Sequence, residues 1–182
     1  MLKLKEMHPQ FGVEIIGIDL SEVLEPNHFS QIELALERYS LVLFRNQIFD
    51  DDSQVTFSRR FGELEYDHVA YGQERKIRYI GCIGNIDEHG KQMRANHKRV
   101  VFSTGNEMWH SDSSFRPVPT RFSISYAYEV TPEGGELEFV STRSAYARLP
   151  DETKEKIENL VAIHDYVYSR SKVGPNVVTP SH

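Results

Sequence analysis

The chain has 182 residues, of which 39% are hydrophobic and 26% are charged, and its formal net charge is −6. These values are typical of a folded, soluble domain, and the acidic balance argues against a nucleic-acid or anionic-membrane surface, so we expect no nucleic-acid or membrane partner. Cys82 is the only cysteine, which excludes an intrachain disulfide and a thiolate-rich metal site.

The N-terminal part of the sequence predicts a strand followed by a helix. The first ten residues are polar and lack a signal-peptide core, and no apolar run approaches a membrane span, so we expect a cytoplasmic protein. Phe11–Leu20 is rich in β-branched residues and predicts a strand. Residues 29–40 place apolar side chains at helical spacing, with Ser30 and Glu33 as a candidate capping box.

The next segments continue this alternation. Leu41–Arg45 predicts a short buried strand, and residues 51–62 predict a helix that acidic and serine residues open and a glycine closes. Residues 78–85 predict another strand. Residues 86–104 are polar and predict a mobile excursion over the surface.

The clearest strand pattern is Arg121–Val130, where aromatic and aliphatic residues alternate with mostly polar or small ones. A Gly-Gly turn then leads to residues 136–141, which predict an antiparallel partner strand. Helices are expected at Thr142–Leu149 and Asp151–Leu160, and a strand at residues 162–169. The pattern favours a mainly β fold with a helical insert (α+β), built as a sandwich or jelly roll.

The segment "WHSDSSF" (Trp109–Phe115) carries the chemistry that stands out most. In extended backbone, residues i and i+2 project from the same face, so His110 and Asp112 can converge on one ion. One imidazole and one carboxylate form two thirds of the 2-His-1-carboxylate triad of iron(II) oxygenases. A loop histidine capped by a nearby carboxylate is the structural alternative.

This segment, preceded by "GN" and followed by "GGELEF", resembles the taurine/2,4-dichlorophenoxyacetate dioxygenase (TauD/TfdA) family of Fe(II)/2-oxoglutarate enzymes. The resemblance extends over "HPQFGVEIIGIDLSEVL", "YSLVLFRNQ", "VTFSRRFGELE" and the helical stretch that ends at "IHDY". The "SDSSF" form is closer to the aryloxyacetate branch than to the taurine branch. The resemblance implies a double-stranded β-helix (jelly roll).

The resemblance also implies roles for particular residues. His110 and Asp112 match the first histidine and the carboxylate of the iron triad. Asn106 matches a substrate-contacting position, and His68 and Tyr71 keep the spacing of a pair that lines the same pocket. These three also have structural alternatives: a strand end for Asn106, a surface position for His68, and a core aromatic for Tyr71.

The sequence departs at two points from the pattern of the family that it resembles. Leu137 occupies the position of a threonine whose hydroxyl helps to hold the distal carboxylate of 2-oxoglutarate, so that hydrogen bond is lost. The distal histidine ligand and the arginine for 2-oxoglutarate have no match within residues 1–182. We therefore expect residues 1–182 to be the N-terminal portion of one dioxygenase domain that lacks the C-terminal strands.

The expected function is that of an Fe(II)/2-oxoglutarate-dependent dioxygenase. Such an enzyme uses dioxygen to convert 2-oxoglutarate to succinate and carbon dioxide while it hydroxylates a small carboxylic acid of the aryloxyacetate type. A taurine-like sulfonate or an alkyl sulfate is the alternative substrate. A non-enzymatic fragment that self-associates through open sheet edges, as a homo-oligomer, is the alternative class.

Overall fold

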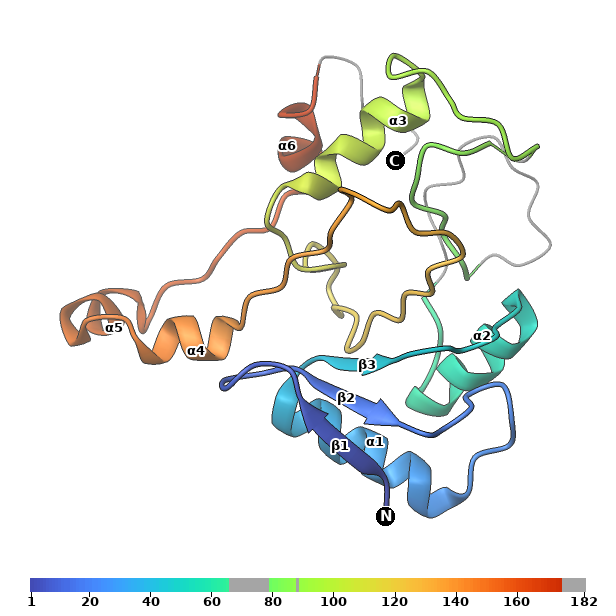
Figure 1. Cartoon of the computed structure of the whole chain (residues 1–182). Helices are drawn as coiled ribbons and strands as arrows, with labels where there is room; N and C mark the ends of the chain where they lie inside the picture. The colour runs from blue at the N-terminus through green and yellow to red at the C-terminus, as the bar shows by residue number, and fades with distance from the viewer. Residues whose placement is uncertain (66–78, 88, 175–182) are drawn as a thin grey trace. The chain divides into compact units, whose positions relative to one another are not determined.

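A computed structural model describes residues 1–65, 79–87 and 89–174, and the chain divides into two compact units. The first unit comprises Met1–Phe57 and Ser125–Val161, and the second comprises the described parts of Ser58–Ile124 and Ala162–His182. Figure 1 labels the helices and strands along the chain. The expected positions of His68 and Tyr71 lie outside the described residues.

The first unit is built on a three-stranded mixed sheet in the order β1-β2-β3. The strands are β1 (Lys3–Glu6), β2 (Val13–Ile16) and β3 (Val42–Phe44). β1 is antiparallel to β2, with Lys3 opposite Ile16, and β2 is parallel to β3, with Val13 opposite Val42. The strands predicted at Phe11–Leu20 and Leu41–Arg45 are confirmed, although β3 is half-buried and not buried as expected. Strand β1 was not predicted because it is charged and short.

Helix α1 (Pro26–Tyr39) connects the two parallel strands, as a parallel pair requires. The helix begins with Pro26, whose missing N–H costs nothing there, and ends at Ser40 in the left-handed conformation (φ 63°). The predicted capping box is wrong, because Ser30 lies inside the helix and its hydroxyl donates to the Pro26 carbonyl at 3.2 Å. The helical interpretation of residues 29–40 itself is confirmed.

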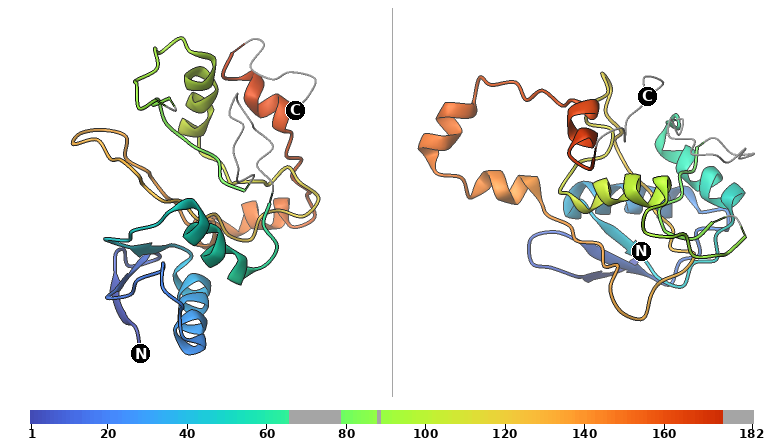
Figure 2. Two further views of the ribbon diagram at one scale, coloured as in Figure 1. Left: turned by 90° about the vertical axis from the view of Figure 1, so that its right-hand side faces the viewer. Right: turned by 90° about the horizontal axis from the view of Figure 1, so that it is seen from above.

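The core of the first unit lies between the sheet and α1, which stays beside the sheet in the turned views (Figures 1 and 2). Val13 and Ile15 alternate with Glu14 along β2, and with Ile32 they are the largest fully buried side chains in the described part of the chain. Glu14 forms ion pairs with Lys5 at 3.7 Å and with Arg45 at 3.3 Å. In β2 the apolar side chains are therefore buried, and the charged side chain between them is neutralised by ion pairs.

The remaining helices are short. They are α2 (Asp51–Ser58), η1 (Arg59–Phe61), α3 (Lys98–Ser103), η2 (Thr104–Glu107), α4 (Thr142–Ala147), α5 (Asp151–Ile157) and α6 (Tyr166–Ser171). Helices α2, α4 and α5 confirm the predicted helices. Helix α2 begins after Asp50, whose carboxylate accepts from the Ser53 backbone N–H at 2.7 Å and from its hydroxyl at 2.6 Å. These two bonds lower the pKa of Asp50.

Several predicted strands are absent from the described structure. Within residues 162–169 the first four residues are irregular and the last four belong to α6 (Tyr166–Ser171), because the Asp165 side chain caps the helix, accepting from the Tyr168 N–H at 2.9 Å. Residues 78–85 form no strand in their described part, and the polar segment 86–104 contains α3, capped by His97. Here local capping outweighs the β-branched composition.

The alternating segment Arg121–Val130 is not a strand among the described residues, and it keeps its two faces only as far as Tyr126, since residues 127–130 are all exposed. Phe122, Ile124 and Tyr126 are half-buried, and the residues between them are exposed. Residues 136–141 likewise form no strand and are mostly exposed. The prediction of a strand pair here is wrong for this structure, because backbone pairing needs a neighbouring strand that no described segment provides. The described fold is a small mixed sheet with helices.

Candidate metal centre

The candidate site follows a helical turn in the second unit. Helices α3 and η2 run from Lys98 to Glu107, and Met108 then adopts an extended backbone (φ −80°, ψ 142°). This change of direction brings His110 and Asp112 into an irregular segment and not into the extended strand backbone on which the i, i+2 argument was based. Both side chains remain partly open to solvent, at 44% and 56% of their surface.

The His110 and Asp112 side chains converge, as their spacing predicted. His110 Nε2 lies 3.3 Å from Asp112 Oδ1. The other ring nitrogen, Nδ1, lies 2.7 Å from the Met108 carbonyl oxygen. Because a carbonyl only accepts, Nδ1 carries the proton, and in the neutral imidazole the Nε2 lone pair faces the carboxylate. Either a proton on Nε2 or a shared cation makes this contact favourable.

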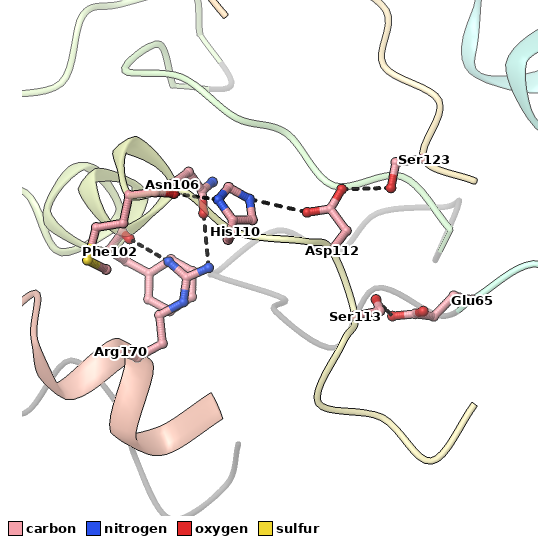
Figure 3. A network of polar contacts seen from close by, with 9 residues as sticks. Glu65, Phe102, Asn106, His110, Asp112, Ser113, Ser123 and Arg170 are labelled. Carbon is pink, nitrogen blue, oxygen red and sulfur yellow. Dashed lines mark hydrogen bonds and ion pairs between the residues drawn. The ribbon is translucent and has the colours of Figure 1, made fainter. Parts of the chain in front are cut away.

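A hydroxyl from a distant part of the chain holds the second oxygen of Asp112. Ser123 Oγ donates to Asp112 Oδ2 at 2.6 Å, across a separation of 11 residues (Figure 3). The two carboxylate oxygens therefore have different neighbours: Oδ2 faces a hydroxyl, and Oδ1 faces the imidazole. The role of Ser123 was not predicted, since the sequence pattern indicates only that this residue lies on the exposed face of the alternating segment.

Glu65 holds the loop that leaves the site. Its carboxylate accepts a hydrogen bond from Ser113 Oγ at 2.8 Å and another from Thr120 Oγ1, and Arg116 Nε lies 2.8 Å from Oε1. Ser113 has a positive φ of 52°, an uncommon conformation for a residue other than glycine. The bond to Glu65 helps to hold this conformation directly after Asp112. None of these three contacts was predicted from the sequence.

Asn106 is bound within the protein by an arginine. Arg170 Nη2 donates to Asn106 Oδ1 at 2.9 Å, and Nη1 donates to the Phe102 carbonyl at 3.3 Å. The guanidinium carbon lies 4.6 Å from the centre of the Phe102 ring and 5.6 Å from that of Tyr166. Arg170 thus connects α6 to the turn before His110. Since a guanidinium only donates, the amide NH2 of Asn106 points away from it.

Leu137, which the family resemblance matched to a threonine, lies in the first unit and is 76% exposed. Among the described residues no cluster of three His, Cys, Asp or Glu side chains could hold a metal ion. His110 and Asp112 are therefore a pair of donors.

The pair fits a divalent transition metal as far as two donors can. Ligands at about 2.1 Å from an ion and at right angles to each other are separated by about 3.0 Å, close to the observed Nε2–Oδ1 distance of 3.3 Å. An imidazole whose second nitrogen donates to a carbonyl is the usual form of a metal-bound histidine. The arrangement would hold a metal through Nε2 and Oδ1.

Comparison with known proteins places the chain in a family. A family model described as "Taurine catabolism dioxygenase TauD, TfdA family" matches residues 3–181. The chain belongs to the TauD/TfdA dioxygenase family.

An alpha-ketoglutarate-dependent 2,4-dichlorophenoxyacetate dioxygenase of Burkholderia sp. (strain RASC) is 33% identical over 171 residues, which are 92% of this chain and 58% of that relative. An (S)-phenoxypropionate/alpha-ketoglutarate-dioxygenase of Sphingobium herbicidovorans is 30% identical over 164 residues, covering 90% of this chain and 53% of that protein. These relatives confirm the resemblance to enzymes of aryloxy acids that the "SDSSF" segment indicated.

A solved structure shares the fold. The crystal structure of AAD-2 in complex with Mn(II) and N-oxalylglycine matches with a TM-score of 0.86 and 33% identity, covering 99% of this chain and 61% of that one. The chain thus spans less than two thirds of the length of these relatives. No helix in the described part of the chain combines the length and apolar character needed to cross a membrane.

Proposed function

We propose that residues 1–182 form the N-terminal portion of an Fe(II)/2-oxoglutarate-dependent dioxygenase domain with a jelly-roll fold. The observation that carries the proposal is the His110–Asp112 pair, whose Nε2 and Oδ1 face each other at 3.3 Å with the Nδ1 proton fixed on a carbonyl. The chain coverage of 58–61% in two relatives supports the assignment to one portion of a longer domain.

The cosubstrate is proposed from chemistry shared with the AAD-2 structure. N-oxalylglycine carries the oxalyl end of a 2-oxo acid, and the AAD-2 structure contains it together with Mn(II). Bound iron(II) would supply the activation of dioxygen that couples the conversion of 2-oxoglutarate to succinate and carbon dioxide with hydroxylation of the substrate. In this chain His110 and Asp112 would supply two ligands, and the Met108 carbonyl would keep Nε2 available.

The proposed substrate class is an aryloxyacetate-type carboxylic acid. The support comes from two relatives, a 2,4-dichlorophenoxyacetate dioxygenase that is 33% identical and an (S)-phenoxypropionate dioxygenase that is 30% identical. Hydroxylation of the carbon between the ether oxygen and the carboxylate gives a hemiacetal, which collapses to a phenol and glyoxylate. Asn106 is proposed to contact the substrate through its amide NH2, the end that Arg170 leaves available as a donor. His68 and Tyr71 are proposed for the same pocket on the family resemblance alone.

The experiment is a metal titration of the 182-residue chain by calorimetry, with Mn(II) as the probe. His110→Ala and Asp112→Ala should each weaken Mn(II) binding at least about tenfold. His8→Ala, which removes an exposed histidine of the first unit, should leave the affinity unchanged. If both site variants bind Mn(II) as the unmodified chain does, the metal centre is elsewhere.

Turnover is measured separately as succinate release with iron(II), 2-oxoglutarate and 2,4-dichlorophenoxyacetate. Glyoxylate formation supports the aryloxyacetate assignment, and turnover only with an alkyl sulfonate or sulfate replaces it. Metal binding without any turnover would identify residues 1–182 as an inactive portion.

A further inference from the structure

We propose that Ser123 is a positioning residue for the metal centre: its hydroxyl fixes the Asp112 carboxylate so that Oδ1 alone faces the ion. The proposal rests on the metal-binding role proposed for His110 and Asp112. It goes further by naming a residue that lies outside the His-x-Asp motif.

The two carboxylate oxygens of Asp112 contact different groups. Oδ2 accepts from Ser123 Oγ at 2.6 Å, which is a short, charge-assisted hydrogen bond. Oδ1 lies on the other side, 3.3 Å from His110 Nε2 (Figure 3). A carboxylate with one oxygen held in this way cannot rotate freely about its last torsion. It therefore presents a single oxygen to an ion that the imidazole also binds.

Both donors of the pair are then restrained by a second partner. The Met108 carbonyl, 2.7 Å from Nδ1, sets the orientation of the imidazole, and Ser123 sets that of the carboxylate. Partners of this kind contribute to metal affinity because an incorrectly oriented ligand must be reordered when the ion binds. The restraint matters more here because the side chain of Asp112 is 56% exposed and has little packing to hold it.

The position of Ser123 in the chain makes the contact specific. In the alternating segment, Ser123 lies on the exposed face between the half-buried Phe122 and Ile124, and Phe122 packs against Phe61 with ring centres 5.2 Å apart. Burial of the neighbouring aromatic ring thus directs the serine hydroxyl outwards. Ser125 lies on the same exposed face two residues further on, which makes it the matched control.

The test measures Co(II) affinity and the visible absorption spectrum of the Co(II)-loaded 182-residue chain. Ser123→Ala and Ser123→Val should raise the Kd about tenfold and change the spectrum. Ser123→Thr, which has the shape of the valine variant but keeps the hydroxyl, should restore both. Ser125→Ala should match the unmodified chain. The threonine and valine variants form an isosteric pair, so their comparison remains decisive if the alanine variant folds poorly.

Three results would count against the proposal. Equal or tighter Co(II) binding by Ser123→Val relative to Ser123→Thr shows that the hydroxyl does not position the ligand. If the Ser123 variants lose no more Co(II) affinity than Ser125→Ala does, the loss reflects a general effect of changing this segment. If His110→Ala and Asp112→Ala also leave Co(II) binding unchanged, the metal centre itself is refuted, and this outcome separates the failure of the proposed function from the failure of the role of Ser123.

Discussion

Gly105→Ala is expected to destabilise the second unit by disturbing Arg170. Gly105 is buried, and a Cβ atom there would overlap Arg170 Nη1 and lie 3.2 Å from its guanidinium carbon and 3.0 Å from Val173 Cγ2. Because the guanidinium is the end of a flexible side chain, it can move away. Doing so, however, breaks its contacts with Phe102 and Asn106.

The magnitude follows from what those contacts contribute. The 2.9 Å bond to Asn106 has a charged donor and is worth about 1.5–3 kcal/mol, and the stacking on Phe102 adds about 0.5–1 kcal/mol at a half-exposed site. Alanine recovers up to about 1 kcal/mol because it is a better helix former than glycine. The net loss is about 2 kcal/mol, which corresponds to about 4–8 °C in unfolding temperature for a chain of this size.

The assay is thermal unfolding in a double-mutant cycle with Arg170→Ala. If the clash is with the guanidinium, Gly105→Ala should cost much less in the Arg170→Ala background, leaving only the tight contact with Val173. Equal costs of Gly105→Ala in both backgrounds would refute the steric reasoning.

Four further outcomes are expected. Ile32→Ala, which truncates a side chain that is 1% exposed, should reduce the free energy of unfolding in urea denaturation by about 2–5 kcal/mol. Leu34→Ala removes the same number of carbons from the same helix at a position that is 63% exposed, and it should change this free energy by less than about 1 kcal/mol. Hydrogen bonds from Ser53 lower the pKa of Asp50 below 3.8. The ionised Asp50 carboxylate therefore contributes to stability above that pH, and the contribution is lost as the pH falls through the folded-state pKa. The difference in unfolding temperature between the unmodified chain and Asp50→Ala should shrink in acid. In a longer form that contains the family's arginine, Leu137→Thr should lower the KM for 2-oxoglutarate about tenfold, and an unchanged KM would mean that another group holds the carboxylate. The 182-residue chain should self-associate in light scattering, because large apolar side chains such as Leu137 are exposed, and a stable monomer would contradict this.

Local patterns in the sequence predicted the first unit well. Helix α1 and strands β2 and β3 follow from apolar spacing, because their partners are close in sequence and the βαβ connection is short. The segment 162–169 was predicted incorrectly because one cap, the Asp165 side chain on the Tyr168 N–H, outweighs its β-branched residues. In Arg121–Val130 the alternation predicted the two faces correctly only up to Tyr126, and Tyr128 is 58% exposed. Strand pairing there depends on a second strand, which no local pattern supplies.

In the candidate site, too, the local arrangement was predicted and the contacts with residues far away in the sequence were not. The i, i+2 spacing predicted the convergence of His110 and Asp112, which the structure shows at 3.3 Å even though the backbone is irregular. The groups that hold the surroundings of the pair come from far away in the chain: Glu65 is 48 residues from Ser113, and Arg170 is 64 residues from Asn106. A serine, a glutamate and an arginine are common surface residues, so nothing in the sequence distinguished these.

The three groups that meet on the Glu65 carboxylate have a consequence for engineering. Ser113 and Thr120 are bound to the same side chain, so the loop between them is closed at its base. Residues 117–119 at the outer end of that loop are exposed. Insertions or replacements confined to these three positions should therefore alter the exposed surface of this loop while its base, held on Glu65, keeps its geometry. This short proline-containing stretch is a natural place to graft new recognition elements or a spectroscopic label.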